Sequence, residues 1–216
     1  NMGLALLIGA LFQQVALLYT NVANVAFLTA LYVPIVPLIY FIFLKKPLSK
    51  FIFLSAALCI LGIWFISKND LEFGGIGDFL SILGAFFWSI HIILISKSSE
   101  MKLEPVITAS LHILFAGFVG LLLAIFIEKP SILNIKGGAF ELLYTGILSI
   151  GLGFTLQTIA QKYSPPSNAA ILLSMESFFA SITAFIVLGQ ILDFNSIIGC
   201  FLILIGVIIS EYYNDY

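Results

Sequence analysis

Residues 9–28, GALFQQVALLYTNVANVAFL, and residues 153–172, GFTLQTIAQKYSPPSNAAIL, decide the architecture, because they match without a gap at an offset of 144 residues. The shared positions are Gly9 and Gly153, Gln13 and Gln157, Ala16 and Ala160, Tyr19 and Tyr163, Asn24 and Asn168, Ala26 and Ala170, and Leu28 and Leu172. Further along, Gly62 matches Gly206 in the same register. Matched Gln, Tyr, Asn and Gly are informative because these residues are sparse in lipid-facing sequence. The match predicts an internal repeat.

Around this repeat the chain is too apolar to fold in water. Hydrophobic residues make up 61% of it and charged residues only 9%, whereas a soluble domain has about 25% charged residues. The charges gather in short clusters, and the apolar stretches between them have the length of a helix that spans about 30 Å of hydrocarbon. We therefore predict an all-α membrane protein, a polytopic helix bundle with about eight spans at 2–19, 22–44, 51–67, 78–96, 105–127, 139–161, 167–189 and 195–210.

Local sequence signals mark two helix starts and one bend. Asp78 follows a glycine-rich turn and is expected to be the N-cap of the fourth span. Pro165 and Pro166 open the seventh span, where a helix needs no backbone donor. Pro34 and Pro37 predict a kink in the second span, and because the matching residues of the other copy are not proline, we expect this kink in one copy only.

Lysine counts predict the orientation in the membrane. If the loops alternate, six lysines lie on one side and three on the other, the six being Lys45, Lys46, Lys50, Lys97, Lys102 and Lys162, and the three Lys68, Lys129 and Lys136. The positive-inside rule makes the lysine-rich side cytoplasmic. We expect a multi-pass protein of the inner (plasma) membrane with both ends of this chain in the cytoplasm.

The repeat is expected to be inverted. The matched stretches at 9 and 153 lie in the first and sixth spans, which are an odd number of crossings apart, so the two copies have opposite orientations in the membrane. Inverted repeats are typical of secondary transporters. The second copy, 78–212, has five helices, whereas 1–67 supplies only the last three of the first copy, so we expect two further helices upstream of Asn1.

A family resemblance rests on the stretch LQTIAQKYSPP at 156–166, which continues as NAAILLSME at 168–176 and as Leu188, Gly189 and Gln190. These residues resemble the eighth-to-ninth helix junction of the drug/metabolite transporter superfamily, EamA type. YTNVANVAFL at 19–28 is similar to the equivalent junction of the first half, and FWSIH at 87–91 resembles the start of the second half. The resemblance implies a ten-helix permease. Gln190 departs from the pattern, because the family often has Glu there.

Glu176 is the only carboxylate well inside a predicted span, about 14 Å from the span's start. An ionisable side chain near the membrane centre costs roughly 2.5–3.5 kcal/mol, so its presence indicates a role. It either binds a cation, a coupling proton or a substrate amine in a cavity, or is protonated and ties two helices together. Tyr32 occupies the equivalent position in the other copy and is a further candidate for substrate binding.

Four other side chains are candidates for substrate binding. His91 and Trp88 lie three residues apart and share a helix face, where the imidazole can exchange protons and the indole can stack on a substrate. Gln13 and Gln157, one from each copy, either line a pseudo-symmetric pathway or bridge helices by amide hydrogen bonds. His112 is expected to be structural, and Cys59 and Cys200 to be small buried hydrophobes.

The sequence favours a secondary transporter that moves a small organic metabolite by alternating access in the lipid bilayer. No catalytic, metal-ligand or cofactor motif is present, and the net charge of −2 gives nucleic-acid binding no electrostatic support. Two alternatives stay open. One is a membrane-embedded enzyme that acts on a lipid-like substrate, and the other is an inactive, truncated transporter. Whether the protein forms a homodimer is also left open.

Overall fold

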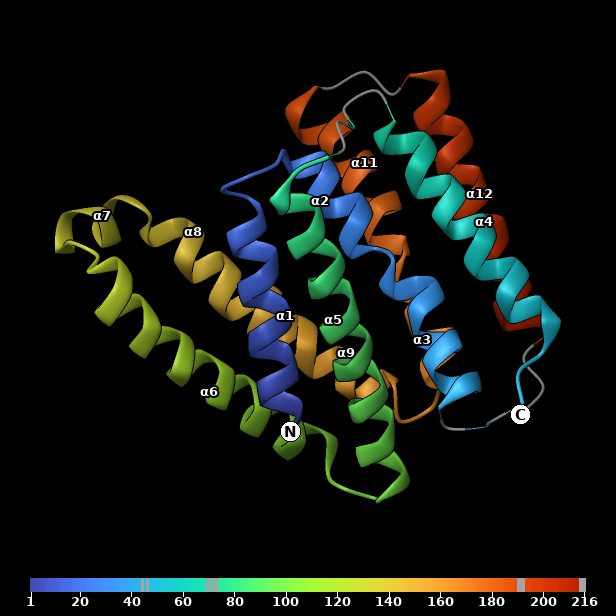
Figure 1. Ribbon diagram of the computed structural model, residues 1–216, viewed down its shortest axis with the longest axis horizontal. Coiled ribbons are helices and arrows are strands. Elements are labelled where there is room, and N and C mark those ends of the chain that lie inside the picture. Colours follow the sequence, from blue (N-terminus) through green and yellow to red (C-terminus); the bar gives the residue numbers. More distant parts are fainter. Residues whose placement is uncertain (44, 46, 69–70, 72–73, 190–192, 214–216) are drawn as a thin grey trace. The chain divides into compact units, whose positions relative to one another are not determined.

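The computed structural model describes residues 1–43, 45, 47–68, 71, 74–189 and 193–213, and its regular elements are all helices. In chain order they are α1 (Met2–Ala16), α2 (Val22–Thr29), α3 (Tyr32–Ile42), α4 (Lys50–Ser67), α5 (Ile76–Glu100), α6 (Pro105–Leu123), the π-helix η1 (Ala124–Glu128), α7 (Ile132–Gly137), α8 (Ala139–Leu143), the π-helix η2 (Tyr144–Gly153), α9 (Phe154–Ala160), α10 (Pro166–Leu173), α11 (Met175–Leu188) and α12 (Phe194–Tyr212) (Figure 1).

The helices reproduce the predicted spans and confirm an all-α polytopic membrane protein. Within the described ranges, seven apolar helical runs are long enough to cross a membrane, namely 22–42, 50–67, 76–100, 105–128, 139–160, 166–187 and 194–212. The first predicted span, 2–19, is the shorter helix α1, whose 15 residues reach about 22 Å. The short helix α7 lies in a segment for which no helix was predicted.

At the start of several helices, a polar side chain accepts a hydrogen bond from a backbone N–H group that has no partner within the helix. Asn21 accepts from the Asn24 N–H at 2.7 Å at the start of α2, and Asp193 accepts from the Ser196 N–H at 2.8 Å at the start of α12. Pro166 occupies the first turn of α10, as predicted. Asp78 is not the cap of α5, because the helix already begins at Ile76; its carboxylate instead accepts from the N–H groups of the preceding turn.

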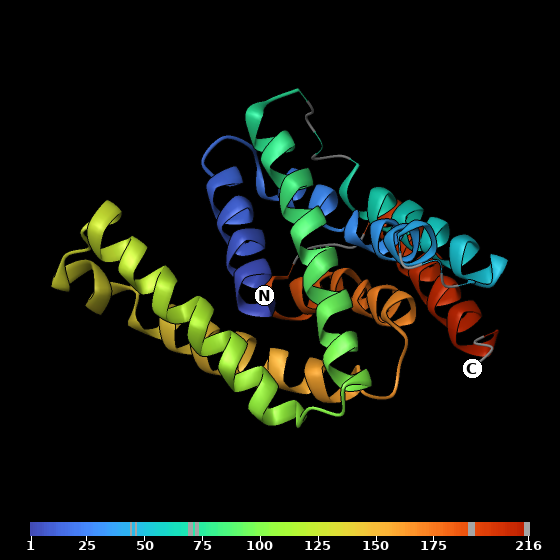
Figure 2. The ribbon, with the colours of Figure 1, turned by 60° about the horizontal axis from the view of Figure 1, so that its bottom comes forward.

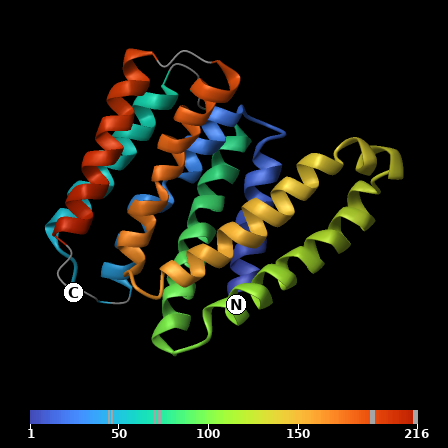
Figure 3. The ribbon, with the colours of Figure 1, turned by 180° about the vertical axis from the view of Figure 1, so that it is seen from behind.

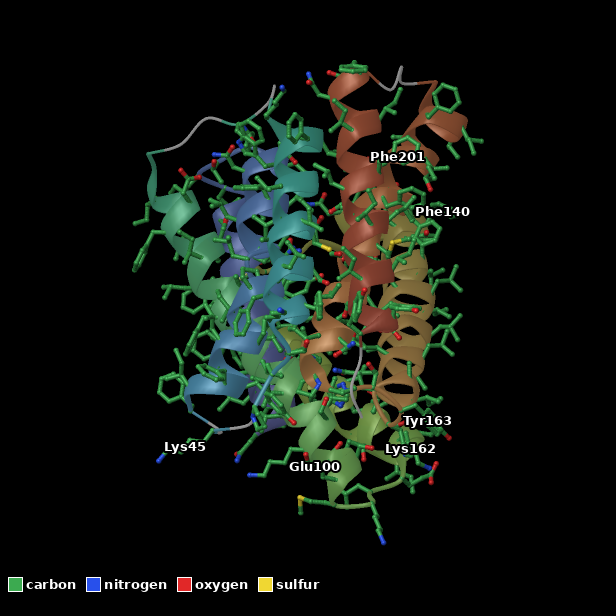
Figure 4. All side chains as sticks on the ribbon, turned by 90° about the vertical axis from the view of Figure 1, so that its right-hand side faces the viewer. Lys45, Glu100, Phe140, Lys162, Tyr163 and Phe201 are labelled. Carbon is green, nitrogen blue, oxygen red and sulfur yellow. The ribbon has the colours of Figure 1, made fainter. Side chains whose placement is uncertain are left out.

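The chain forms two compact units. The hairpin unit comprises residues 1–8 and 94–164, and the core unit comprises residues 9–93 and 165–216. In the hairpin unit, α6 packs along the run formed by η2 and α9 (Figure 2). Figure 4 shows Glu100, Lys162 and Tyr163 at one end of this unit and Phe140 toward the other. The 101–104 and 161–165 loops therefore lie at the same end, as alternating loops require.

In the core unit, α4 and α12 pack side by side along their lengths (Figures 1 and 3). Glycines permit this approach: a Cβ added at Gly62 would lie 2.6 Å from the Gly199 carbonyl oxygen, and one added at Gly206 would lie 2.9 Å from the Ser55 carbonyl oxygen. Residues that come later in α4 contact residues that come earlier in α12, so the two helices are antiparallel.

The α4–α12 contacts also follow the register of the repeat. Gly62 in the first copy corresponds to Gly206 in the second, and Gly199 in the second corresponds to Ser55 in the first. Gly62 contacts Gly199, and their counterparts Gly206 and Ser55 contact each other in the same way. Cys59 and Ile203, whose sulfur and carbonyl oxygen lie 3.9 Å apart, are themselves separated by 144 residues, so this pair lies on the local two-fold axis. Equivalent helices of the two copies thus run in opposite directions, as an inverted repeat requires.

Candidate functional site

Two membrane-spanning runs of the core unit are broken at equivalent positions. The first run breaks between α2 and α3, where Ala30 caps α2, and the second breaks at Ser174, between α10 and α11. Ala30 and Ser174 are 144 residues apart. The hydrogen bonds match as well: the Val33 N–H donates to the Ala30 oxygen at 2.9 Å and the Ser177 N–H to the Ser174 oxygen at 3.2 Å, both three residues back along the chain instead of four.

The matched breaks correct the expectation of a kink in one copy only. Pro34 and Pro37 follow the first break, but Ser174 breaks the second run with no proline at the places equivalent to these two. Pro34 lies in the first turn of α3, where a missing N–H removes no bond of that helix. Proline is therefore not the cause common to the two breaks.

Tyr32 and Glu176 occupy equivalent places just beyond the breaks. Tyr32 is the first residue of α3 and Glu176 the second residue of α11. Tyr32 is half-buried and packs against two clusters of buried side chains, one of which contains Ile171 of α10 and the other Ile92 of α5. The Glu176 carboxyl group lies close enough to the Tyr32 phenol for electrostatic interaction. The structure thus brings these two candidate residues together.

The Glu176 side chain is not enclosed by the helices of its unit. It is exposed although it stands in the middle of an apolar run, and within the described part of the chain no hydrogen bond ties its carboxyl group to another helix. Both readings of Glu176, as a cavity residue and as a protonated link between helices, stay predictions. An ionisable group at this depth normally faces a bundle interior or a water-filled space.

Three further candidates form a second cluster in the core unit. Trp88 Nε1 donates to Gln13 Oε1 at 3.1 Å, which links α5 to α1. His91, which is fully buried, meets the Trp88 ring edge-on with 5.8 Å between ring centroids. The spacing of Trp88 and His91 had predicted that they share a face, whereas the bond to Gln13 depends on how α1 and α5 pack.

Gln157, the counterpart of Gln13 in the second copy, makes a different kind of hydrogen bond. It lies in the hairpin unit, and its Nε2 donates to Gln161 Oε1 one turn along the same helical segment, at 3.4 Å. His112 is buried in the same unit with Nδ1 2.9 Å from the Thr108 carbonyl oxygen, a local bond that fits the structural role expected of it. Cys59 and Cys200 are buried free thiols, again as expected.

Sequence reasoning noted the matched pair Asn24 and Asn168 but not their partners. Both side chains are buried. Asn24 donates to Asp78 Oδ1 at 2.9 Å, and Asn168 donates to Ser210 Oγ at 3.0 Å. The signal available beforehand was the survival of an amide side chain in both copies at the start of an apolar run. In the ranges that the structure describes, no group of three or more His, Cys, Asp or Glu residues is arranged to hold a metal ion.

Comparison with known proteins identifies the family to which this chain belongs. The sequence profile of the EamA-like transporter family matches residues 75–212, which is more than half of the chain. A protein of Archaeoglobus fulgidus named as an uncharacterized transporter is 32% identical over 97% of this chain and 67% of its own length. Proteins of Clostridium kluyveri and Methanothermobacter thermautotrophicus with the same name are 26% identical over 96% and 90% of this chain, and over 69% and 58% of their own lengths.

A solved structure shows the same fold. One crystal structure superposes with a TM-score of 0.84 over 97% of this chain and 76% of that chain, at 17% sequence identity. At that identity the likeness concerns the fold alone. The first-named relative is longer, so the chain spans about two thirds of its length.

Proposed function

The chain belongs to the EamA-like transporter family and is a multi-pass membrane transporter, and from that premise we propose that it is a secondary transporter which moves a small organic metabolite by alternating access. The observation that carries the proposal is the pair of breaks at Ala30 and Ser174, at equivalent positions of two copies with opposite orientation. Broken helices at matching places of an inverted repeat are where secondary transporters bind their substrates, because the interrupted backbone supplies polar groups near the membrane centre.

The proposed domain organisation follows the repeat. Residues 78–212 form a five-helix second repeat, which is supported by the match of the family profile to 75–212. Residues 1–67 form the last three helices of a first repeat. The antiparallel packing of α4 against α12, in the register of the repeat, supports the inverted relationship of the two copies.

In this proposal Tyr32 and Glu176 bind the substrate at the breaks, while Gln13, Trp88 and His91 line its route through the core unit. Gln157 stays a separate candidate in the hairpin unit. Glu176 is the charged group of the central site, and its exposed carboxyl binds a cation, a coupling proton or a substrate amine. The lysines of the chain all lie near the ends of the apolar runs or in loops, and arginine is absent. The part of the site that this chain supplies therefore offers an anionic substrate no lysine or arginine, and we expect it to prefer cationic or neutral metabolites over carboxylates and phosphates.

We also propose that the protein lies in the plasma membrane with both ends of this chain in the cytoplasm, on the strength of the lysine count. The presence of Glu100 and Lys162 at one end of the hairpin unit supports the loop alternation on which that count depends (Figure 4).

Flux measurements on the reconstituted protein test the proposal. Proteoliposomes are loaded with radiolabelled amines, amino acids, sugars and carboxylates in turn, and exchange and gradient-driven flux are followed separately. Glu176→Gln is compared with Glu141→Gln, which changes an exposed carboxylate near the end of another apolar run. Loss of gradient-driven flux with exchange retained assigns a coupling proton to Glu176, and loss of both assigns substrate binding. Unchanged flux in Glu176→Gln, or no flux of any compound in the parent protein, contradicts the proposal.

A further inference from the structure

Asn24 fixes the start of α2, the end that lies away from the first break, to a neighbouring helix. The short helices α2 and α10, which precede the two breaks, are called half-helices below. Asn24 is the third residue of α2, which runs for eight residues from Val22 to the first break. Its side chain is fully buried, and its Nδ2 donates to Asp78 Oδ1 at 2.9 Å in the first turn of α5. This bond joins two segments that are far apart in the sequence, so it holds the start of α2 against α5.

Asp78 is itself held in place by three other donors. Thr20 Oγ1 donates to the same carboxylate oxygen at 3.1 Å, and the N–H groups of Gly74 and Gly75 donate to the other oxygen at 2.7 and 3.3 Å. A buried carboxylate with four donors is a firm acceptor, because charge-assisted hydrogen bonds are roughly twice as strong as neutral ones. Asn24 thus bonds to a carboxylate whose position is fixed by three other hydrogen bonds.

Asn168 has the same place on the equivalent half-helix. It is the third residue of α10, which also runs for eight residues, from Pro166 to the second break. Its buried Nδ2 donates to the Ser210 carbonyl oxygen at 3.1 Å and to Ser210 Oγ at 3.0 Å, near the end of α12. Its Nδ2 also donates to Glu211 Oε1, at the longer distance of 3.5 Å. The two equivalent asparagines therefore bind different helices, one through a carboxylate and the other mainly through neutral groups.

The two bonds stand at opposite sides of the membrane. The first half-helix begins in the second predicted span and the second in the seventh, so their starts are an odd number of crossings apart; Figure 3 shows the blue half-helix beginning at the top and the orange one at the bottom. In each half-helix about 9 Å separates the asparagine from the break. Breaking the hydrogen bond of one asparagine therefore lets the half-helix move on that side of the membrane only.

We infer that Asn24 and Asn168 are the gate residues of the transport cycle: the Asn24–Asp78 bond closes the external side of the central site, and the Asn168–Ser210 bond closes the cytoplasmic side. The inference rests on the proposed function. Alternating access requires that one side opens while the other stays closed. Asn24 reaches its carboxylate at 2.9 Å and Asn168 reaches one only at 3.5 Å, so the external bond is the stronger of the two, and the resting protein opens more readily toward the cytoplasm.

Sided labelling of the central site tests the inference. Tyr32→Cys supplies a thiol at the first break, and a membrane-impermeant maleimide is added to right-side-out or inside-out vesicles; Cys59 and Cys200 are buried. Asn24→Ala is expected to raise the external labelling rate about tenfold and to lower the cytoplasmic rate, the size expected of one hydrogen bond to a charged group. Asn168→Ala is expected to change both rates in the opposite direction by about fivefold.

Two further variants separate gating from damage. Asp78→Asn keeps an acceptor without the charge, so it should shift labelling in the same direction as Asn24→Ala but by less. Asn195→Ala removes an asparagine whose side chain, among the described residues, donates locally to Asp193 at 3.2 Å, and it should leave both rates unchanged. Retention of the monodisperse peak on size exclusion shows that each variant is folded.

The outcomes distinguish the two proposals. If the thiol at position 32 is labelled from neither side in any variant, the central site itself is wrong. If it is labelled but Asn24→Ala and Asn168→Ala shift the rates in the same direction, or not at all, the asparagines are structural and the gate inference is overturned.

Discussion

Gly62 and Gly199 meet through their backbones, and a Cβ added to either residue would collide with the carbonyl oxygen of the other. The relationship is mutual, so a side chain at either position would push the two helices apart. The core unit is therefore built around an α4–α12 pair whose separation is set by backbone atoms, which cannot change rotamer to make room.

Gly62→Ala should destabilise the protein by about 1–3 kcal/mol, because its Cβ would stand 2.6 Å from the Gly199 oxygen and force the helices apart. The midpoint of thermal unfolding in detergent measures the loss. Gly117→Ala is the matched control: it also lies inside a membrane helix, but nothing stands within 4 Å of its Cβ position. It should be neutral or slightly stabilising, and an equal loss in the two variants would contradict close packing as the cause.

Trp88→Phe should lower stability by about 1 kcal/mol through loss of the bond to Gln13 Oε1, while the aromatic contact with His91 is kept. A double-mutant cycle with Gln13→Leu isolates the bond, and the coupling energy should lie at about 0.5–1.5 kcal/mol. Trp64→Phe provides the comparison for loss of an indole elsewhere. Additive effects of Trp88→Phe and Gln13→Leu would mean that the hydrogen bond does not contribute.

The break between α2 and α3 should survive the loss of its prolines. In Pro34→Ala, Pro37→Ala and the double variant, the distance between spin labels at the exposed positions Val22 and Leu38 should remain that of the parent protein, because Ser174 breaks the equivalent run with no proline at the equivalent places. Pulsed electron paramagnetic resonance measures it. A shift to the spacing of one straight helix would show that proline causes the break.

Cysteine substitutions at loop lysines should report the orientation. Lys102→Cys and Lys162→Cys should react with an impermeant maleimide only from the cytoplasmic side, and Lys129→Cys only from outside. Intact and inverted vesicles provide the two directions. Reaction of all three cysteines from the same side would refute the alternating loops, whereas complete reversal would refute only the cytoplasmic assignment.

The spans could be predicted from sequence because hydrophobic length and charge position alone determine them. The stretch predicted at 105–127 forms a continuous helical run over Pro105–Glu128, and its start is marked by proline. The breaks could not be predicted in the same way. Ala30 and Ser174 are compatible with a helix, and their turns arise in buried surroundings that only the folded core unit supplies.

The candidate site was predicted to the extent that it depends on local spacing or on the repeat. The shared face of His91 and Trp88 follows from helical periodicity. Glu176 follows from its charge inside an apolar span, and Tyr32 from the offset of 144 residues. The bond from Trp88 to Gln13 depends on the rotation of α1 against α5, and the partners of Asn24 and Asn168 depend on which helix ends lie beside them. Such pairings are tertiary, and one sequence does not contain them.

The contact between Cys59 and Ile203 has an evolutionary consequence. A residue on a two-fold axis meets its own counterpart, so in a symmetric pair of identical half-length chains this position would have to fit a copy of itself. Joining the two halves in one polypeptide removes that restriction, and a small side chain can then face a large one. The Cys–Ile pair is a contact available only to a chain whose halves have diverged.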